Sequence, residues 1–105
     1  MNNFYPLACI ALAALAFAIG GICMKLSAGL TQWPASLGVF LLFTLGAGLQ
    51  ALAMTRGDLG AIYIAVLGLE AVLAFGFGVV LFHEPMSPGR LLAVTLVVAG
   101  IACLR

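Results

Sequence analysis

The chain has 105 residues, of which 66% are hydrophobic and 7% are charged, with a formal net charge of +1. Its mean hydropathy of +1.32 excludes an ordinary soluble domain, and its few basic residues argue against nucleic-acid binding. We therefore expect an all-α integral membrane protein whose first partner is the lipid bilayer.

Four apolar segments follow one another along the chain. A helix needs about 20 residues to cross a hydrocarbon core of roughly 30 Å. The sequence predicts spans at about 4–26, 34–54, 58–82 and 88–104, so that residues 1–105 form a single four-helix transmembrane domain. The last apolar run, 91–104, is short, but Arg90 and Arg105 flank it and can reach the two membrane interfaces.

Short polar segments separate the predicted helices. Pro34 and Pro88 suit the first turns of the second and fourth helices, and Asp58 suits the N-cap of the third. No loop has room for a soluble domain. Nothing at the N-terminus resembles a cleavable signal, because no basic region precedes the first apolar run.

The chain lacks the residue patterns of common enzymes. It has no Ser/His/Asp arrangement, no glycine-rich phosphate loop and no paired histidines, and we expect no catalytic residue, metal or cofactor. Cys9, Cys23 and Cys103 lie in apolar runs without metal-ligand spacing, which favours packing roles. We interpret His83 as a polar loop residue.

The positive charges are balanced across the predicted membrane. Lys25 and Arg90 lie on one side, and Arg56 and Arg105 lie on the other. Lys and Arg normally bias one set of loops toward the cytoplasm, so this balance indicates a chain that can insert in both orientations. Four helices are also too few to enclose a solute path. We therefore expect a homodimer, antiparallel and forming a bundle of eight helices.

Glu70 lies at the centre of the otherwise uncharged third span. A carboxylate at that depth is costly and usually functional. One interpretation is a proton- and substrate-binding residue, with Tyr63 on the same helix face two turns earlier. The alternative is a structural residue that is protonated or hydrogen-bonded to Tyr63, Thr44 or Gln50.

Small residues mark predicted helix contacts. Ala93 and Gly100 are seven residues apart on the fourth helix and therefore share one face, which we predict to be a dimer contact. Gly68 is predicted to permit close packing or a kink in the third helix.

The chain resembles the small multidrug resistance transporters of the drug/metabolite transporter superfamily. The resemblance covers nearly the whole chain, and it rests on these residues: Met24, Lys25, Ser27 and Gly29 after the first helix, Trp33-Pro34, Gly60 and Tyr63, and Ala99-Gly100-Ile101 with Ala93 before it. It implies a four-helix dimeric transporter in which the tyrosine lines the binding chamber and the fourth helix forms the dimer contact.

Several positions depart from the family pattern. The first-helix glutamate, which binds substrate and proton in the family, aligns with Phe17, so that Phe17 contributes only an aromatic surface to the predicted site. Val66 replaces a tryptophan, and the Gly-x-Gly kink reads Gly68-Leu69-Glu70. Glu70 is therefore the only carboxylate at the membrane centre that is available for coupling.

The C-terminal half is similar to larger members of the superfamily. The segments 69–72 (Leu-Glu-Ala-Val) and 83–87 (His-Glu-Pro-Met-Ser) resemble segments of ten-helix drug/metabolite transporters, and the His-Glu-Pro turn also resembles small subunits that flip a modified undecaprenyl lipid. This resemblance implies a structural role for Glu84 at the end of a helix, and it also supports the structural interpretation of Glu70.

We predict a multi-pass transporter of a bacterial-type inner membrane that moves a small or lipophilic cation or amine by alternating access, with proton coupling through Glu70. Two alternatives stay open. One is a flippase-like transporter of a lipid-linked sugar or another amphiphile. The other is a non-transporting subunit of a heterodimer, although the balanced charges argue against a fixed partner orientation.

Overall fold

The computed structural model describes residues 4–103, and these fold into helices without a strand. The helices are α1 (Phe4–Leu26), α2 (Trp33–Ala53), the single 3₁₀ turn η1 (Met54–Arg56), α3 (Leu59–Phe82) and α4 (Pro88–Ala102). The predicted four-helix, all-α fold class is confirmed. The helix ends lie within two residues of the limits given for the predicted spans. The spans themselves stay a prediction, and position 104 lies outside the described residues.

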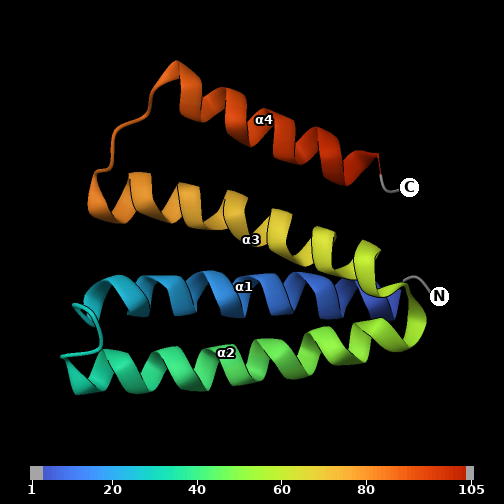
Figure 1. The fold of residues 1–105 in the computed structure, drawn as a ribbon, viewed down its shortest axis with the longest axis horizontal. Helices are drawn as coiled ribbons and strands as arrows, with labels where there is room; N and C mark the ends of the chain where they lie inside the picture. Colours follow the sequence, from blue (N-terminus) through green and yellow to red (C-terminus); the bar gives the residue numbers. More distant parts are fainter. Residues whose placement is uncertain (1–3, 104–105) are drawn as a thin grey trace.

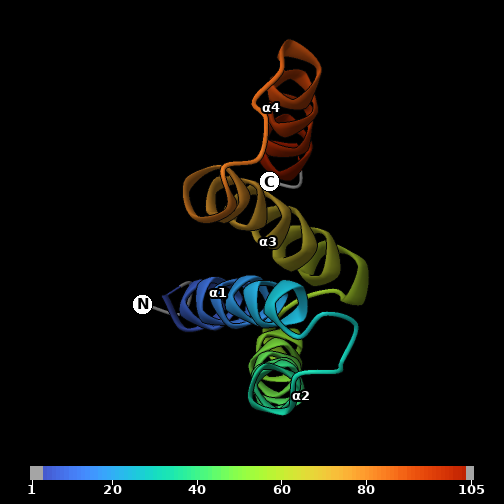
Figure 2. The same cartoon turned by 90° about the vertical axis from the view of Figure 1, so that its left-hand side faces the viewer.

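The helices stand in a row rather than in a square bundle. α1 packs against α2 and α3, and α3 packs against α4. Figures 1 and 2 show the resulting order α2, α1, α3, α4, with α4 at one edge. The molecule measures 40 × 34 × 20 Å. No residue of α4 is buried, so most of this helix lies exposed in a single copy of the chain.

Three helices are long and apolar enough to cross a membrane: Tyr5–Leu26, α2 together with η1 (Trp33–Arg56), and α3. α4 has 15 residues, which corresponds to about 22 Å at 1.5 Å per residue and is shorter than the hydrocarbon core of roughly 30 Å. The crossing of the membrane by α4 therefore stays a prediction from this geometry.

The helix ends follow the local sequence at most positions. Pro34 and Pro88 lie in first turns, and the Ser87 hydroxyl caps α4 by accepting a hydrogen bond from the Arg90 backbone N–H at 3.2 Å. Asp58 occupies the N-cap of α3 as predicted, but its side chain makes no capping hydrogen bond. His83 ends α3 in the left-handed conformation (φ 55°), which histidine tolerates better than bulky residues.

The core lies where α1 meets α2 and α3. It consists of Cys9, Ala13, Phe17, Ala53, Ile62 and Val66. Alanines on α1 let the helices approach closely, as is common in membrane bundles. Cys9 is buried in this core, in agreement with its predicted packing role.

The turn between α1 and α2 has an unusual backbone. Ala28, Gly29 and Leu30 follow one another with φ of 50°, 74° and 70°. Ser27, which is 1% exposed, ties the turn together: its hydroxyl donates to the Met24 carbonyl at 2.7 Å and accepts from the Leu30 backbone N–H at 3.1 Å.

Candidate functional site

Glu70 lies on the side of α3 that faces α1. Val66, four residues earlier, is fully buried in the core with α1 residues, and Ala74, four residues later, lines a hollow between α1 and α3. Residues four apart share a helix face, so Glu70 lies between these two positions on the α1-facing stripe. Glu70 itself is only partly buried, which leaves its carboxyl group accessible.

The Glu70 carboxyl has no polar partner within the part of the chain that the structure describes. Among residues 4–103, none of the side-chain hydrogen bonds involves it, and the single ion pair is elsewhere. Hydrogen bonds from Glu70 to Tyr63, Thr44 or Gln50, which are one form of the structural interpretation, are therefore absent among residues 4–103 of one copy of the chain. The other form, a permanently protonated Glu70, stays an alternative. The acceptor atoms of Glu70 are free for a proton or a cation.

Phe17 lies in the core of the subunit rather than in a cavity. It is 9% exposed, and its ring centroid lies 5.2 Å from that of Phe43 on α2. The ring also covers Gly46, where an added Cβ would lie 2.7 Å from the ring. Phe17 and Val66 belong to one core cluster, and Glu70 follows Val66 by about one turn. A substrate-binding role for Phe17 stays a prediction.

Tyr63 lies at the edge of the α1–α3 contact. It is 47% exposed, whereas its neighbour Ile62 is 7% exposed. Tyr63 and Glu70 are about 10 Å apart along the helix axis and share a face, as their spacing requires. The Tyr63 ring is exposed and Glu70 is only partly buried, so a substrate that enters beside α3 can reach both residues. Their joint role in substrate binding stays a prediction.

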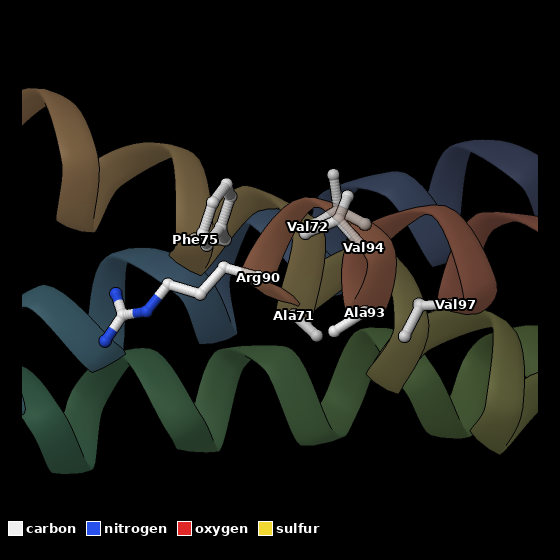
Figure 3. A pocket seen from close by; sticks show the side chains of 7 residues that line it. All are labelled: Ala71, Val72, Phe75, Arg90, Ala93, Val94 and Val97. Carbon is white, nitrogen blue, oxygen red and sulfur yellow. The ribbon is translucent and has the colours of Figure 1, made fainter. Parts of the chain in front are cut away.

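A groove runs between α3 and α4. One part, of about 240 Å³, is lined by the residues drawn in Figure 3, and a second part of about 500 Å³ includes Gly68, Gly100 and Ile101. The two parts share Ala71 and Val97, and Figure 3 shows the Arg90 guanidinium pointing away from the apolar lining.

Gly68 lies where α3 packs closely against α4. A Cβ at this position would lie 2.6 Å from Ile101 Cδ1 and 3.3 Å from Val97 Cγ1. Both distances are shorter than ordinary carbon contacts of about 3.5–4.0 Å. The close approach that the sequence suggests at Gly68 is thus made within one subunit.

The predicted dimer residues line the groove between α3 and α4. Ala93 lines the part of the groove that measures about 240 Å³. A Cβ added to Gly100 would meet no atom within 4 Å. α4 has no buried residue, and Leu92 and Leu96 are 60% and 63% exposed. This surface is available for a partner helix or for lipid.

A charged cluster joins the end of α1 to the loop after α3. The Lys25 Nζ atom lies 3.5 Å from Glu84 Oε2 and 5.5 Å from the centroid of the Phe82 ring. Glu84 was expected from the sequence only at the end of a helix, without this pairing. The signal was present, because the first and third loops are predicted to lie on the same side of the membrane.

The structure places the predicted charge groups at two ends of the molecule. Lys25 and Arg90 lie at the end where α1 leads into α2 and α3 leads into α4, and Arg56 lies at the opposite end, over the Tyr5 ring at 4.8 Å. Arg105 lies outside the described residues. Among residues 4–103, no cluster of His, Cys, Asp or Glu could hold a metal ion.

Comparison with known proteins agrees with this architecture. Residues 5–97 match the profile of the family described as Small Multidrug Resistance protein. The chain belongs to the small multidrug resistance family. Members of the small multidrug resistance family are four-helix membrane transporters and not enzymes, and this chain is a multi-pass efflux transporter of the same type.

Two of the similar members of the small multidrug resistance family have names that refer to drugs or to guanidinium. The chain is 32% identical over 97 residues to the multidrug resistance protein EbrB of Bacillus subtilis, covering 91% of this chain and 82% of the relative. It is 31% identical over 94 residues to the guanidinium exporter of Citrobacter freundii, covering 90% of each chain. A further similar protein is the uncharacterized membrane protein YvaE of Bacillus subtilis, at 32% identity over 98 residues, with 91% of this chain and 81% of the relative covered.

Proposed function

We propose that the protein exports a small or lipophilic cation in exchange for protons, with Glu70 as the residue that binds both. The observation that carries this proposal is the position of Glu70. Among residues 4–103 it is the one acidic residue inside a span, it has no polar partner, and it lies on the stripe of α3 that faces α1.

A shared carboxylate explains exchange without any further group. The ionised Glu70 carboxylate attracts a cation, whereas the protonated carboxyl does not, so proton binding and cation binding exclude each other. Alternating access would present the same residue to one side of the membrane and then to the other. In a dimer, two Glu70 residues near the symmetry axis would titrate as a coupled pair.

The names of the relatives support the substrate class. Guanidinium, which the Citrobacter freundii relative exports according to its name, is a small planar cation that a single carboxylate can bind through paired N–H donors. Tyr63 would add a ring face to the same site, and Phe17 would border it from the core. In the family pattern the acid stands at position 17 on α1, whereas here we place it one turn beyond Val66 on the facing helix.

We further propose that the transporter is an antiparallel homodimer in a bacterial inner membrane. The exposed α4 surface around Ala93 and Gly100 supplies a contact of small residues, and the balanced charges permit both orientations. The test fuses to the C-terminus, in separate proteins, a reporter that is active in the cytoplasm and one that is active outside it. Activity of only one of the two reporters would exclude dual insertion.

Reconstitution in liposomes tests the role of Glu70. Wild-type protein should release protons from the vesicles when guanidinium or tetraphenylphosphonium is added outside, and the Glu70→Gln variant should lose at least about 100-fold in rate, as for other essential proton-transfer groups. The matched control is Asp58→Asn, because Asp58 lies at a helix end and its side chain makes no capping bond.

The outcomes separate the alternatives. Proton-coupled uptake that persists in Glu70→Gln would refute the proposal for that residue. Lipid scrambling without cation transport would indicate a flippase. Activity that appears only after a homologous second subunit is added would indicate a heterodimer.

A further inference from the structure

The cluster at the end of α1 has the composition of a binding site for an organic cation. The Lys25 ammonium is 3.5 Å from the Glu84 carboxylate and 5.5 Å from the centre of the Phe82 ring. Carboxylates and aromatic faces both bind ammonium and guanidinium ions in proteins. In this structure the protein's own ammonium occupies the site.

The backbone places the Glu84 carboxylate over α3. His83 turns the chain at a positive φ, and the Glu84 backbone N–H then donates to the Gly78 carbonyl at 3.1 Å. The Glu84 side chain folds back over Gly78, and a Cβ at Gly78 would collide with its carboxylate. Glu84 is thus held over the last turns of α3, with 34% of its side chain exposed.

A hollow of about 120 Å³ lies between α1 and α3 beside this carboxylate. Small residues form part of its walls, Ala18 and Gly21 on α1 and Ala74 and Gly78 on α3. The remaining lining residues are larger: Ile22, Lys25, Phe77, Phe82 and Glu84. This volume exceeds the 10–15 Å³ that a water molecule requires. Ala74 is one helical turn from Glu70, so the hollow ends close to the proposed transport carboxylate.

We infer that Glu84 and Phe82 form an outer cation site at the mouth of the α1–α3 contact, and that Lys25 occupies it until an arriving organic cation displaces it. The inference rests on the proposed cation export, because it gives the cation a position between bulk water and Glu70. Lys25 is 56% exposed, so its ammonium can move into water when the site is taken.

The tethered ammonium lowers the apparent affinity of the site. An exposed ion pair forms with an equilibrium constant of roughly one to five, so the free fraction of Glu84 is about one half to one sixth. The apparent Kd of a competing cation is the intrinsic Kd divided by this fraction. Removal of the Lys25 charge should therefore lower the apparent Kd by roughly two- to six-fold.

The test is a titration with guanidinium, followed by NMR shifts of the Gly78 and Glu84 amides in the full-length Glu70→Gln protein. In this variant the proposed transport site at Glu70 lacks its carboxylate and cannot compete with Glu84 for guanidinium. Lys25→Met should tighten binding by the stated factor, Lys25→Arg should leave it unchanged, and Lys25→Met with Glu84→Gln should abolish it. A Lys25→Gln variant gives the same test if Lys25→Met does not fold.

The control separates a local effect from a general change in charge. Arg90→Met removes one positive charge at the same end of the molecule, where Arg90 donates to the Pro85 carbonyl rather than to Glu84, and it should leave the apparent Kd unchanged. Equal effects of Lys25→Met and Arg90→Met, or binding that survives Glu84→Gln, would overturn the outer site. Failure of the Glu70 proposal is seen separately, as transport by Glu70→Gln in liposomes.

Discussion

Substitution of Gly68 by Ala tests the α3–α4 packing directly. The new Cβ would lie 2.6 Å from Ile101 Cδ1 and 2.8 Å from Cγ1, about 1 Å inside the optimal carbon separation. Either Ile101 changes rotamer or α4 moves away. Overpacking of this kind costs about 1–3 kcal/mol.

A second glycine on the same helix isolates this cost. Alanine is better than glycine in a helix by about 0.8–1.0 kcal/mol, and Gly76→Ala should show that gain, since a Cβ there meets no atom within 4 Å. Gly68→Ala should therefore be less stable than Gly76→Ala by about 1–3 kcal/mol. Unfolding in mixed micelles with increasing SDS, followed by circular dichroism, measures both variants.

The double variant identifies the atoms responsible. Ile101→Ala removes the atoms that the new Cβ would meet, so the losses of Gly68→Ala and Ile101→Ala should not add, and the coupling should exceed about 0.5 kcal/mol. Equal stability of Gly68→Ala and Gly76→Ala, or additive losses in the double variant, would refute the packing that we describe.

Three further substitutions probe other contacts. Gly78→Ala should displace the Glu84 carboxylate and break its pairing with Lys25. The NMR shift of the Lys25 side-chain NH₃⁺ group should then change, and an unchanged shift would contradict that contact. Gly100→Leu should leave the subunit folded, since its surroundings are open, but should shift crosslinking from dimer to monomer; an undiminished dimer would remove α4 from the interface. Ser87→Ala should cost about 1 kcal/mol through loss of the α4 cap, and unchanged stability in the SDS titration would contradict it.

Much of the fold follows from the sequence because each span is a long apolar run bounded by polar residues. The rotation of the helices does not follow. α3 is apolar in nearly every direction, so the usual amphipathic signal for an inward face is missing. Only Val66 at 0% exposed and the hollow beside Ala74 reveal that Glu70 faces α1.

The candidate site was predictable only in part. Glu70 is apparent from the sequence because a lone carboxylate in a span is costly. The burial of Phe17 against Phe43 and Gly46 depends on ring packing between helices, and the pairing of Lys25 with Glu84 joins residues far apart in the chain. Neither contact has a periodic pattern, so neither could be derived from spacing alone.

The left-handed turn after α1 has a consequence for motion. Ala28 and Leu30 have positive φ, and each such residue costs about 1–2 kcal/mol that local contacts must offset. A turn held by Ser27 in so restricted a backbone cannot act as a loose hinge. We therefore expect α1 and α2 to move as one rigid unit during transport.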